Sequence, residues 1–442
     1  MSLAAVAQAG AGFVERMLQT VAPLTGAAPG LSALRARRAA QLQSLALPTT
    51  RDEEWRFTDL SLLLRHTYSA AIDTPAVTLA ALEPWLLPEA AASRLVFVNG
   101  VYAPHLSVHA LPAGVHICLL SEALADSAIA ARVSTALDAS GDQTIFAVLN
   151  AALCGEGAVL LVEANQVIAA PLHVLFVSVP QSTAHVAAPR CLVLAERGSQ
   201  ATIVEDYVSL ADGNYFNTAV SEWVLGEGAQ VNHAKLQREA PSAFHIATTV
   251  VSLARDAQYL STSITLGARL SRHDVRVRLA GEGAHCTVNG LNLLAGRQLG
   301  DTHSLIDHAM PHCTSTQLHK CIVDDNAHAV FNGKVRVRRD AQKTDSRQSS
   351  RNLLLSEKAR VDTKPELQID ADDVKCAHGA TVGQLDMDEV FYLQSRGLSQ
   401  SASRSLLTFA FAAEIIDQLP VASLHDSLRR WVIERMHVEV LP

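Results

Sequence analysis

Hydrophobic and polar residues alternate along much of the chain's middle and second half. Short runs of this kind are His173–Val179, Val275–Leu279 and Lys334–Arg338. In the last two runs valine occupies every second position and a basic residue lies between, which is the period of a strand with one buried face. This alternating pattern begins near Val159 and continues for more than 200 residues. Because no long helical segment separates the strands, a doubly wound α/β fold is disfavoured.

A small residue precedes several of these strands. Four turn segments end in alanine followed by a polar residue, at Ala229, Ala257, Ala284 and Ala327. The alanines are 28, 27 and 43 residues apart, and the longer last interval leaves room for two coils. A β-helix buries a continuous core in this way, by stacking short strands with a small residue at each corner. The pattern favours such a solenoid, with a β-sandwich or barrel as the alternative.

Helical periodicity marks both ends of the chain. Near the N-terminus two apolar faces are predicted, the first from Phe13, Val14, Met17, Leu18 and Val21, and the second from Leu31, Leu34, Leu42 and Leu45. Proline cannot continue a helix, so we expect Pro48 to end the second one. Two C-terminal stripes are separated by Pro420, and they comprise Leu406, Phe409, Ala413 and Ile416, then Leu424, Leu428, Val432 and Met436.

Shorter signals lie between the first helices and the alternating region. Thr50 and Glu53 resemble a capping box that opens a short helix around Trp55. Leu95–Val98 followed by Asn99-Gly100 predicts a strand and a turn, and the alanine-rich stretch Ser121–Leu137 predicts a helix. We therefore expect a helical and mixed domain over 1–155, a β-helix over 156–385 and a helical domain over 386–442.

Composition narrows the class of protein. Of 442 residues, 49% are hydrophobic and 18% charged, which excludes an intrinsically disordered chain. The net charge of −8 comes without a basic block, so nucleic-acid binding is not expected. No apolar run approaches the roughly 20 residues that span a bilayer, and no signal peptide is recognisable at the start. Seven scattered cysteines are too few for a disulfide framework, which predicts a soluble protein of the reducing cytoplasm.

Common enzyme signatures are missing from the sequence. It contains no G-x-x-x-x-G-K-[ST], no G-x-S-x-G and no H-E-x-x-H segment. We therefore expect no P-loop nucleotide site in this chain.

Two groups of soft metal ligands remain. The first group is a dense run of histidines and cysteines: His308, His312, Cys313, His319 and Cys321. It has no C-x-x-C pair, and its spacing fits no structural zinc site. The preferred interpretation is that these residues occupy interior or edge positions of a coil, and metal binding is the alternative.

The second group is the pair Cys376 and His378. Two residues apart on a strand, the thiol and imidazole would lie on one face. Such a pair suits two ligands of one soft metal or cluster, or a thiolate beside a basic neighbour. A buried structural cysteine beside a hydrogen-bonded histidine is the alternative.

Read together, segments from both ends of the chain resemble a known family. They are Glu54-Trp-Arg-Phe-Thr58, His308 to Lys320, Phe331-Asn-Gly333, Ala341-Gln-Lys-Thr-Asp345, Asn352-Leu-Leu-Leu-Ser356, Pro365-Glu-Leu367, Ala371-Asp-Asp-Val-Lys-Cys-Ala-His-Gly-Ala-Thr381 and Phe391-Tyr-Leu-Gln-Ser-Arg-Gly397. In this order they resemble the SufB/SufD family of scaffold subunits in Suf-type iron–sulfur cluster assembly. Within it, SufD is the closer branch, because SufB carries an N-terminal cysteine motif and a Glu where this chain has Gly379, and no cysteine here precedes Cys118.

The resemblance implies a right-handed parallel β-helix core flanked by helical domains. It implies a non-catalytic subunit that pairs with SufB through the β-helices and binds the ATPase SufC through the C-terminal helices. A transient Fe–S cluster would form at the SufB–SufD interface, with His378 as the candidate ligand on this side and Cys376 less securely assigned. Cluster type, iron source, binding of a reduced flavin and a homodimer of the isolated chain stay open.

Other functions remain as alternatives. The chain could be a purely structural subunit with no ligand role, or the paralogous scaffold SufB. Parallel β-helices also serve as carbohydrate-active enzymes, and Glu366, Asp370, Asp372 and Asp373 supply carboxylates for acid/base work. Aromatic residues, on which sugars stack, make up only 5% of the chain, which disfavours that class.

Overall fold

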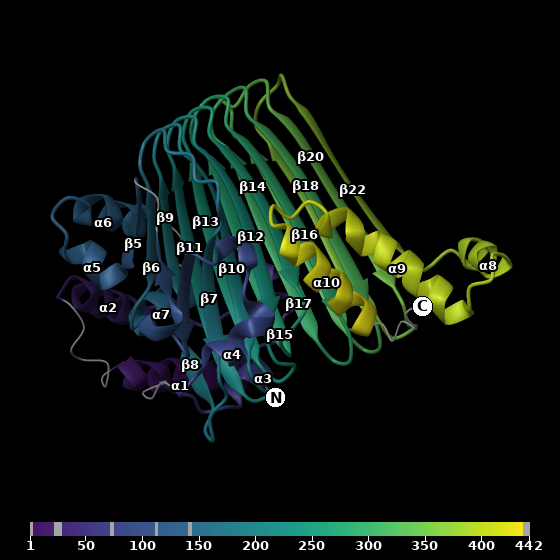
Figure 1. Ribbon diagram of the computed structural model, residues 1–442, viewed down its shortest axis with the longest axis horizontal. Helices are drawn as coiled ribbons and strands as arrows, with labels where there is room; N and C mark the ends of the chain where they lie inside the picture. The colour runs from purple at the N-terminus through teal and green to yellow at the C-terminus, as the bar shows by residue number, and fades with distance from the viewer. Residues whose placement is uncertain (1–2, 22–28, 71–74, 111–113, 140–143, 436–442) are drawn as a thin grey trace.

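A computed structural model of the chain describes residues 3–21, 29–70, 75–110, 114–139 and 144–435. Two sheets, parallel except at their N-terminal edges, lie face to face and wind together as a β-helix, and helices lie at both ends of the chain (Figure 1). The predicted β-helix with flanking helices is therefore confirmed.

Successive strands alternate between the two sheets. Sheet A contains, in spatial order, β5 (Val115–Leu119), β6 (Ala158–Val162), β9 (Arg190–Ala195), β11 (Tyr215–Leu225), β13 (Phe244–Leu253), β15 (Leu270–Leu279), β17 (Leu299–His308), β19 (His328–Val337) and β21 (Arg360–Ile369), with β8 (His185–Ala187) joining β11 to β1 (Ser69–Ala70). Sheet B contains β3 (Val101–Tyr102), β2 (Ser93–Val98), β7 (Leu172–Ser178), β10 (Gln200–Ser209), β12 (Gln230–Arg238), β14 (Gln258–Thr265), β16 (His285–Leu294), β18 (Thr314–Val323), β20 (Asp345–Leu354) and β22 (Lys375–Gly383), with β4 (Val108–His109) beside β2. Each coil therefore contributes one strand to each sheet.

Alternation along each strand separates an inner from an outer face. On β15, Val275 and Val277 are buried in the core between the sheets, whereas Arg276 and Arg278 lie on the outer face, as the sequence predicts. The register continues without a slip, so that residues one coil apart are direct neighbours. A single residue type can therefore form a ladder along the whole solenoid.

The structure confirms that buried small residues occupy the corners of the coils, and it corrects the expected spacing of these corners. Ala229, Ala257 and Ala284 are fully buried and precede strands β12, β14 and β16 of sheet B. The next corner of that series is Cys313, 29 residues after Ala284 and also fully buried. Ala327 precedes β19 of sheet A instead. The expectation of two coils within the 43-residue interval was wrong. That interval runs from Ala284, at a corner before a strand of sheet B, to Ala327, at a corner before a strand of sheet A.

The helices of the N-terminal region lie mainly on the outer face of sheet A, although the one at Leu79–Leu82 packs on sheet B beside Val96 and Val177. They are α1 (Leu3–Val21), α2 (Pro29–Leu42), α3 (Ser61–Leu64), α4 (Leu79–Leu82), α5 (Leu120–Ala125), α6 (Ala130–Ala139) and α7 (Ile145–Leu153), and short 3-10 turns lie at Glu53–Trp55, Glu83–Trp85, Pro88–Ala90 and Pro104–Leu106. Phe13 and Met17 are fully buried, which confirms the first helical face, whereas the side chain of Val21 lies outside the described residues. Helices α6 and α7 pack against β11, and α7 also against β13.

Three local predictions in this region need correction. Helix α2 ends at Leu42, well before Pro48, because the next residues form a turn in which Ser44 N–H donates to the Gln41 carbonyl. Thr50 is not the N-cap of the 3-10 turn at Trp55. That turn starts after Asp52, and the Asp52 carboxylate accepts a hydrogen bond from Thr49 N–H at 2.7 Å. The predicted Ser121–Leu137 helix is two helices, broken at Asp126, whose Oδ1 accepts from Ala128 N–H. The strand and turn at Leu95–Gly100 are confirmed.

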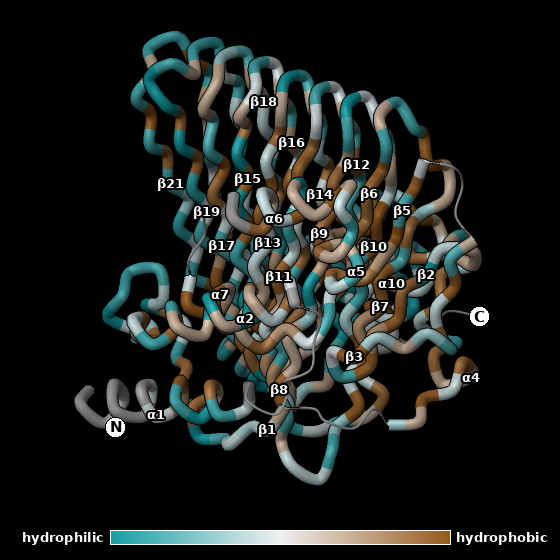
Figure 2. The backbone as a smooth tube through the Cα atoms, turned by 90° about the vertical axis from the view of Figure 1, so that its left-hand side faces the viewer, coloured by the Kyte–Doolittle hydropathy of each residue, from teal (hydrophilic) through white to brown (hydrophobic). Residues whose placement is uncertain are grey.

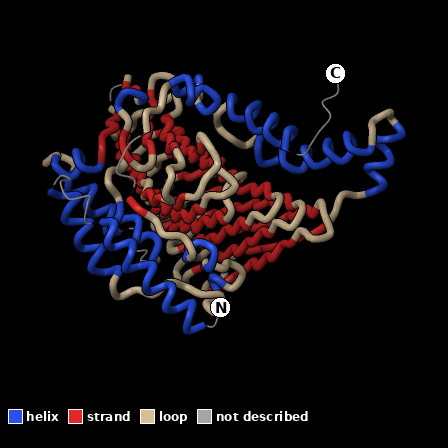
Figure 3. Tube along the Cα trace, turned by 90° about the horizontal axis from the view of Figure 1, so that it is seen from below, coloured by secondary structure: helices blue, strands red, loops and turns tan. Residues whose placement is uncertain are grey.

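The C-terminal helices lie on the other side of the solenoid (Figure 3). They are α8 (Met387–Ser395), α9 (Gln400–Ile416) and α10 (Ala422–Arg435), and α9 packs on β16 and β18 of sheet B. The predicted stripe on α10 is confirmed at Leu424, Leu428 and Val432, and Met436 lies outside the described residues. On α9 the prediction was partly wrong. Leu406 is 47% exposed, because the small residues Ala402 and Ala412 face the sheet and let the helix approach it closely.

One end of the solenoid is open. Strands β21 and β22 are the last of their sheets, and most of β22 is exposed. Figure 2 shows hydrophobic colour concentrated around β6, β9 and β10, and more hydrophilic colour in the last coils near β19 and β21. No helix among the described residues is long and apolar enough to cross a membrane.

Candidate functional site

Cys376 and His378 lie on β22, the edge strand of sheet B. Cys376 pairs in register with Ser346 of β20, and His378 pairs with Gln348. Ser346 and Gln348 are buried between the sheets, so the cysteine and histidine continue the same inward-facing rows onto the open last coil. The expectation that the two side chains share one strand face is confirmed. Cys376 is half-buried and His378 is exposed.

A ladder of hydroxyl groups continues inward from the cysteine row. The Ser346 and Ser315 hydroxyls are 2.8 Å apart, and Ser315 Oγ is 2.9 Å from His308 Nε2. His308 is fully buried and its Nδ1 has no hydrogen-bond partner in the described part of the chain. Burial lowers the pKa of His308 to about 4, so the imidazole is neutral at neutral pH.

A parallel ladder of amides continues from the histidine row. Gln348 Nε2 donates to Gln317 Oε1 at 2.8 Å, and Gln317 exchanges hydrogen bonds with Ser304 at 2.9 and 3.0 Å. Gln348 Oε1, in the layer next to His378, accepts no hydrogen bond from a described residue. The two candidate residues are therefore the exposed ends of polar rows that line the interior of the last coils.

The electrostatics favour a protonated thiol at Cys376. Burial raises the pKa of Cys376, the negative charge of Asp345 raises it further, and a hydrogen bond from the Ser346 backbone acts in the opposite direction. The idea of a thiolate poised by a basic neighbour therefore finds no support in this state of the molecule. A metal ion that binds the sulfur would have to displace the proton.

Two donors are an incomplete ligand set. Tetrahedral iron or zinc takes four ligands, and within the described ranges no group of three or more His, Cys, Asp or Glu side chains converges on one point. Cys376 and His378 face the same way as the interior rows, and they are accessible because β22 is the last strand of its sheet. Among the described residues this pair therefore supplies at most two of the four ligands that such an ion takes.

The denser group between His308 and Cys321 is dispersed by the fold. His319 stacks on Phe331 with a centroid distance of 4.4 Å, and burial lowers its pKa to about 3. Cys313 fills a corner, where its Sγ lies 3.3 Å from the Gly281 carbonyl. Cys321 is buried in an apolar cluster, and His312 is exposed in a turn. The preferred interpretation, interior or edge positions of the coils, is confirmed.

The carboxylates considered for sugar chemistry do not form a pair. Glu366 lies on the outer face of β21 and binds Lys334 at 2.7 Å and Lys364 at 3.5 Å. Asp373 binds Lys343 in the turn before β22. No hydrogen bond or ion pair joins Asp370 or Asp372 to another described carboxylate. An acid and a base facing one substrate bond are thus not assembled here.

Comparison with known families decides the relationship. Residues 16–174 match the family described as the SufBD protein N-terminal region, and residues 177–411 match the SUF system FeS cluster assembly, SufBD core domain. The chain belongs to the SufBD family. The SufBD core match covers the coils from β8 to β22, helix α8 and most of α9, and it ends before α10.

Individual relatives agree with the SufBD assignment. The chain is 45% identical over 400 residues to the iron-sulfur cluster assembly SufBD family protein slr0076 of Synechocystis sp., covering 88% of each chain. It is 35% identical over 409 residues to the iron-sulfur cluster assembly protein SufD of Escherichia coli, covering 90% of each. It is also 32% identical over 435 residues to protein ABCI7, chloroplastic, of Arabidopsis thaliana, covering 95% of this chain and 90% of that one. Members of this family take part in iron–sulfur cluster assembly.

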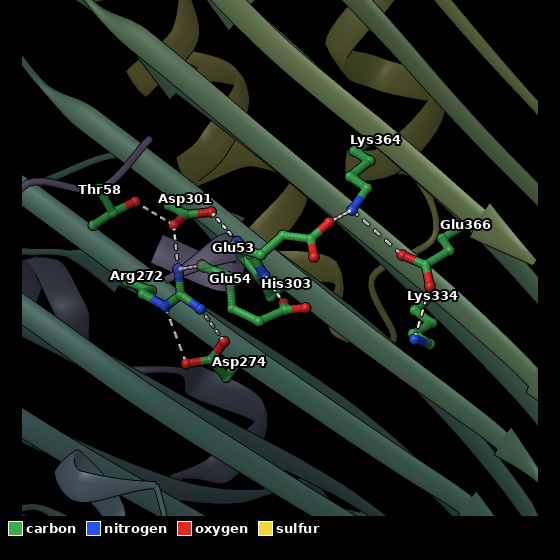
Figure 4. Close-up of polar contacts among 10 residues, drawn as sticks. All are labelled: Glu53, Glu54, Thr58, Arg272, Asp274, Asp301, His303, Lys334, Lys364 and Glu366. Atoms are coloured by element: carbon green, nitrogen blue, oxygen red, sulfur yellow. Dashed lines mark hydrogen bonds and ion pairs between the residues drawn. The ribbon is translucent and has the colours of Figure 1, made fainter. Parts of the chain in front are cut away.

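A second polar constellation in this SufBD chain was not predicted from sequence. Figure 4 shows Arg272 at its centre, where the 3-10 turn at Glu53–Trp55 meets sheet A. Arg272 donates to Asp301 at 2.5 Å, to Asp274 at 2.8 and 3.1 Å and to the Glu54 carbonyl at 2.8 Å. Thr58 also donates to Asp301. We call these residues, with His303, the N-terminal clasp.

His303 completes the N-terminal clasp. Its Nε2 lies 3.0 Å from Asp301 and its Nδ1 lies 3.1 Å from Glu54. Burial alone would lower the pKa of His303, but the charge of Asp301 and the hydrogen bonds to Asp301 and Glu54 outweigh burial and raise it to about 9. The segment Glu54–Thr58 belongs to a family motif to which sequence reasoning gave no chemistry. The one available signal was Arg272 and Asp274, opposite charges on the same face of a strand.

Proposed function

We propose that this chain is a non-catalytic scaffold subunit of Suf-type iron–sulfur cluster assembly. It pairs with SufB through the open edge of its β-helix and binds the ATPase SufC through its C-terminal helices. The cluster is cargo, built at the SufB interface and passed on. The observation that carries this proposal is the half-site: Cys376 and His378 lie on an exposed edge strand, with too few donors to hold a cluster alone.

The open edge supports pairing with a second β-helix. β21 and β22 each have a strand neighbour on one side only, so their other backbone edges have no partner among the described strands. An unpaired, exposed edge is a template for strand addition. A partner strand added beside β22 would bring its own side chains into the rows that end at Cys376 and His378. We propose that SufB supplies the missing thiolate there, with His378 as the principal ligand on this side and Cys376 as a second donor.

The C-terminal helices support docking of another partner. Helix α8 projects beyond the sheets next to β22 (Figure 1), and its apolar side chains Met387, Phe391 and Tyr392 are 55%, 70% and 57% exposed. Leu406 of α9 adds a fourth exposed apolar side chain. Clustered exposed apolar residues of this kind mark interaction sites. We propose residues 386–442 as the SufC-docking domain, with 156–385 as the β-helix and 1–155 as the N-terminal domain, in a cytoplasmic protein.

Cluster loading tests the half-site directly. The chain is co-expressed with SufB and SufC, and iron and acid-labile sulfide are measured on the purified complex for His378→Ala and Cys376→Ala. We expect His378→Ala to lower cluster content several-fold and Cys376→Ala to lower it less. His116→Ala is the matched control, since His116 is also exposed on a strand but lies on β5 at the other end of sheet A. Unchanged cluster content in His378→Ala would remove it from the site.

Two further outcomes separate the alternatives. Normal cluster assembly by a His378/Cys376 double variant that still forms the complex would establish a purely structural subunit. Phe391→Ser with Tyr392→Ser tests docking: SufC should no longer copurify, while SufB remains bound. Loss of SufB with retention of SufC would contradict the assignment of α8.

A further inference from the structure

A basic groove crosses the outer face of sheet A. Two adjoining cavities of about 390 and 470 Å³ share the side chains of Arg276, Leu305 and Arg336. Trp55 and Thr144 bound the first cavity, and Ala136 of α6 and the apolar edge of β11 bound the second. We call the two cavities together the arginine groove. It lies on the opposite sheet from Cys376 and His378.

The charge of the arginine groove is positive although the protein is acidic. Its walls carry the six basic residues Arg272, Arg276, Arg278, Lys334, Arg336 and Arg338. His303 adds a seventh cation at neutral pH, since its pKa is raised to about 9. Four carboxylates also line the walls, so the local balance is seven against four in a chain whose net charge is −8.

Each of those four carboxylates already has a partner. Asp307 accepts from Arg338 at 2.6 and 2.9 Å, and Glu222 accepts from Arg190 at 2.7 Å through both oxygens. Asp274 is held by Arg272, and Glu54 by His303, within the N-terminal clasp. The acids of the groove are therefore not available to neutralise further cations.

Two guanidinium groups of the arginine groove have no partner among the described residues. Arg278 and Arg336 are exposed, and neither side chain makes an ion pair or hydrogen bond with any described residue. They flank Asp307 in one ladder, since Arg278 pairs in register with Asp307 and Asp307 with Arg336. Two strand spacings therefore separate them, roughly 10 Å between backbones, which long arginine side chains can bridge. A guanidinium fork matches the oxygens of phosphate and carboxylate.

We propose that the arginine groove binds a small multivalent oxyanion, a diphosphate or a polycarboxylate, between Arg278 and Arg336. The concave shape argues for a small molecule, because α6 and the Glu53–Trp55 turn close the groove on either side. The N-terminal clasp acts as the wall of this site: it fixes Trp55 and keeps Glu54 and Asp274 paired. This assignment gives the Glu54–Thr58 motif a task separate from cluster binding.

Calorimetry on the full-length chain tests the proposal. Inorganic pyrophosphate and citrate are titrated separately at low and at physiological salt. Arg278→Gln with Arg336→Gln should weaken binding about tenfold or more, since charge-assisted hydrogen bonds to two guanidinium groups are lost. Tighter binding of pyrophosphate identifies a phosphate ligand, and tighter binding of citrate a carboxylate ligand.

A charge-matched control separates a site from general attraction. Arg339→Gln with Arg347→Gln also removes two positive charges, at exposed positions outside the groove, and should bind pyrophosphate and citrate as the parent does. The proposal is overturned if both double variants lose affinity equally, or if neither anion binds the parent at physiological salt. Since the assay measures no cluster, its result is independent of the role of His378.

Discussion

The guanidinium carbon of Arg272 lies 3.8 Å from the ring centroid of Trp55. The stacked pair joins β15 of the solenoid to a turn more than 200 residues earlier in the sequence, and Arg272 is only 2% exposed. The same side chain is charge-paired with two buried or nearly buried carboxylates, Asp274 and Asp301. Arg272 is therefore the cation on which docking of the N-terminal segment depends.

Removal of that cation should destabilise the fold. Arg272→Met leaves Asp301 and Asp274 without their buried counter-ion, and loss of one partner of a buried pair costs about 3–5 kcal/mol. Chemical unfolding should report a decrease of that size in the free energy of unfolding. Arg278→Gln, six residues further along β15 at an exposed site, should change it by less than about 0.5 kcal/mol. Equal effects of the two variants would show that the N-terminal clasp contributes no special stability.

The same network predicts a dependence of stability on pH. The pKa of His303 is raised to about 9 from an ordinary value of about 6.5. Below pH 6.5 the histidine is protonated in folded and unfolded chains, and its stabilising contribution is fully present. As pH rises from 6.5 through 9 the folded state holds a proton that the unfolded state has lost, so stability falls.

The size of this loss is on the order of 3 kcal/mol, given the nearly buried side chain. His303→Gln should remove the dependence, which is measured as the difference between parent and variant unfolding free energies at pH 6.5 and pH 9.5. That difference should shrink towards high pH. A difference that stays constant with pH would mean that His303 does not titrate in this range.

Cys376 should react slowly with alkylating agents, because the thiol is the resting form. Burial and the charge of Asp345 both raise its pKa. Asp345→Asn removes the second cause and should accelerate iodoacetamide labelling of Cys376 at pH 8 several-fold, as read by mass spectrometry of the peptide. Asp426→Asn, an exposed carboxylate on α10, should leave the rate unchanged. No acceleration in Asp345→Asn would exclude that carboxylate as a determinant of the thiol pKa.

One glycine on an inward-facing row and one on the opposite face of the edge strand together test how tightly the interior is packed. A Cβ atom on Gly290 of β16 would lie 2.3 Å from His319 Nδ1, which is itself stacked on Phe331. We expect Gly290→Ala to lower stability by about 1–3 kcal/mol through overpacking. Gly379→Ala on β22 meets no atom within 4 Å and should be nearly neutral by the same unfolding measurement. A neutral Gly290→Ala would mean that His319 can move aside.

Much of the fold could be predicted because it depends on neighbours in sequence. The alternation of Val275 and Arg276 decides which residue is buried, whatever lies beyond the strand. Cys376 and His378 share a face for the same reason. Where packing against another element decided the outcome, prediction failed. The exposed Leu406 and the corner at Cys313 are examples, since a helix can rotate and a corner accepts any small residue that fits.

The N-terminal clasp and the arginine groove had no readable local signature. Arg272 stacks on Trp55, which is 217 residues away in the sequence. Arg278 and Arg336 lie in one ladder only because of the register of three neighbouring strands. No spacing in the sequence encodes such distances.

The sequence by itself determined the parallel β-helix, its flanking helices and the pairing of thiol with imidazole on one strand face. Residue periods of two and 3.6 and small corner residues, all of which are local, favoured a solenoid with flanking helices, and the family resemblance specified a parallel β-helix. Only the tertiary structure decided that this strand is the open edge, that burial and Asp345 raise the pKa of Cys376 there and that its row continues inward to His308. Exposure, pKa and long-range charge pairing depend on which surfaces come into contact. Those contacts form only when the coils stack and the helices pack on them.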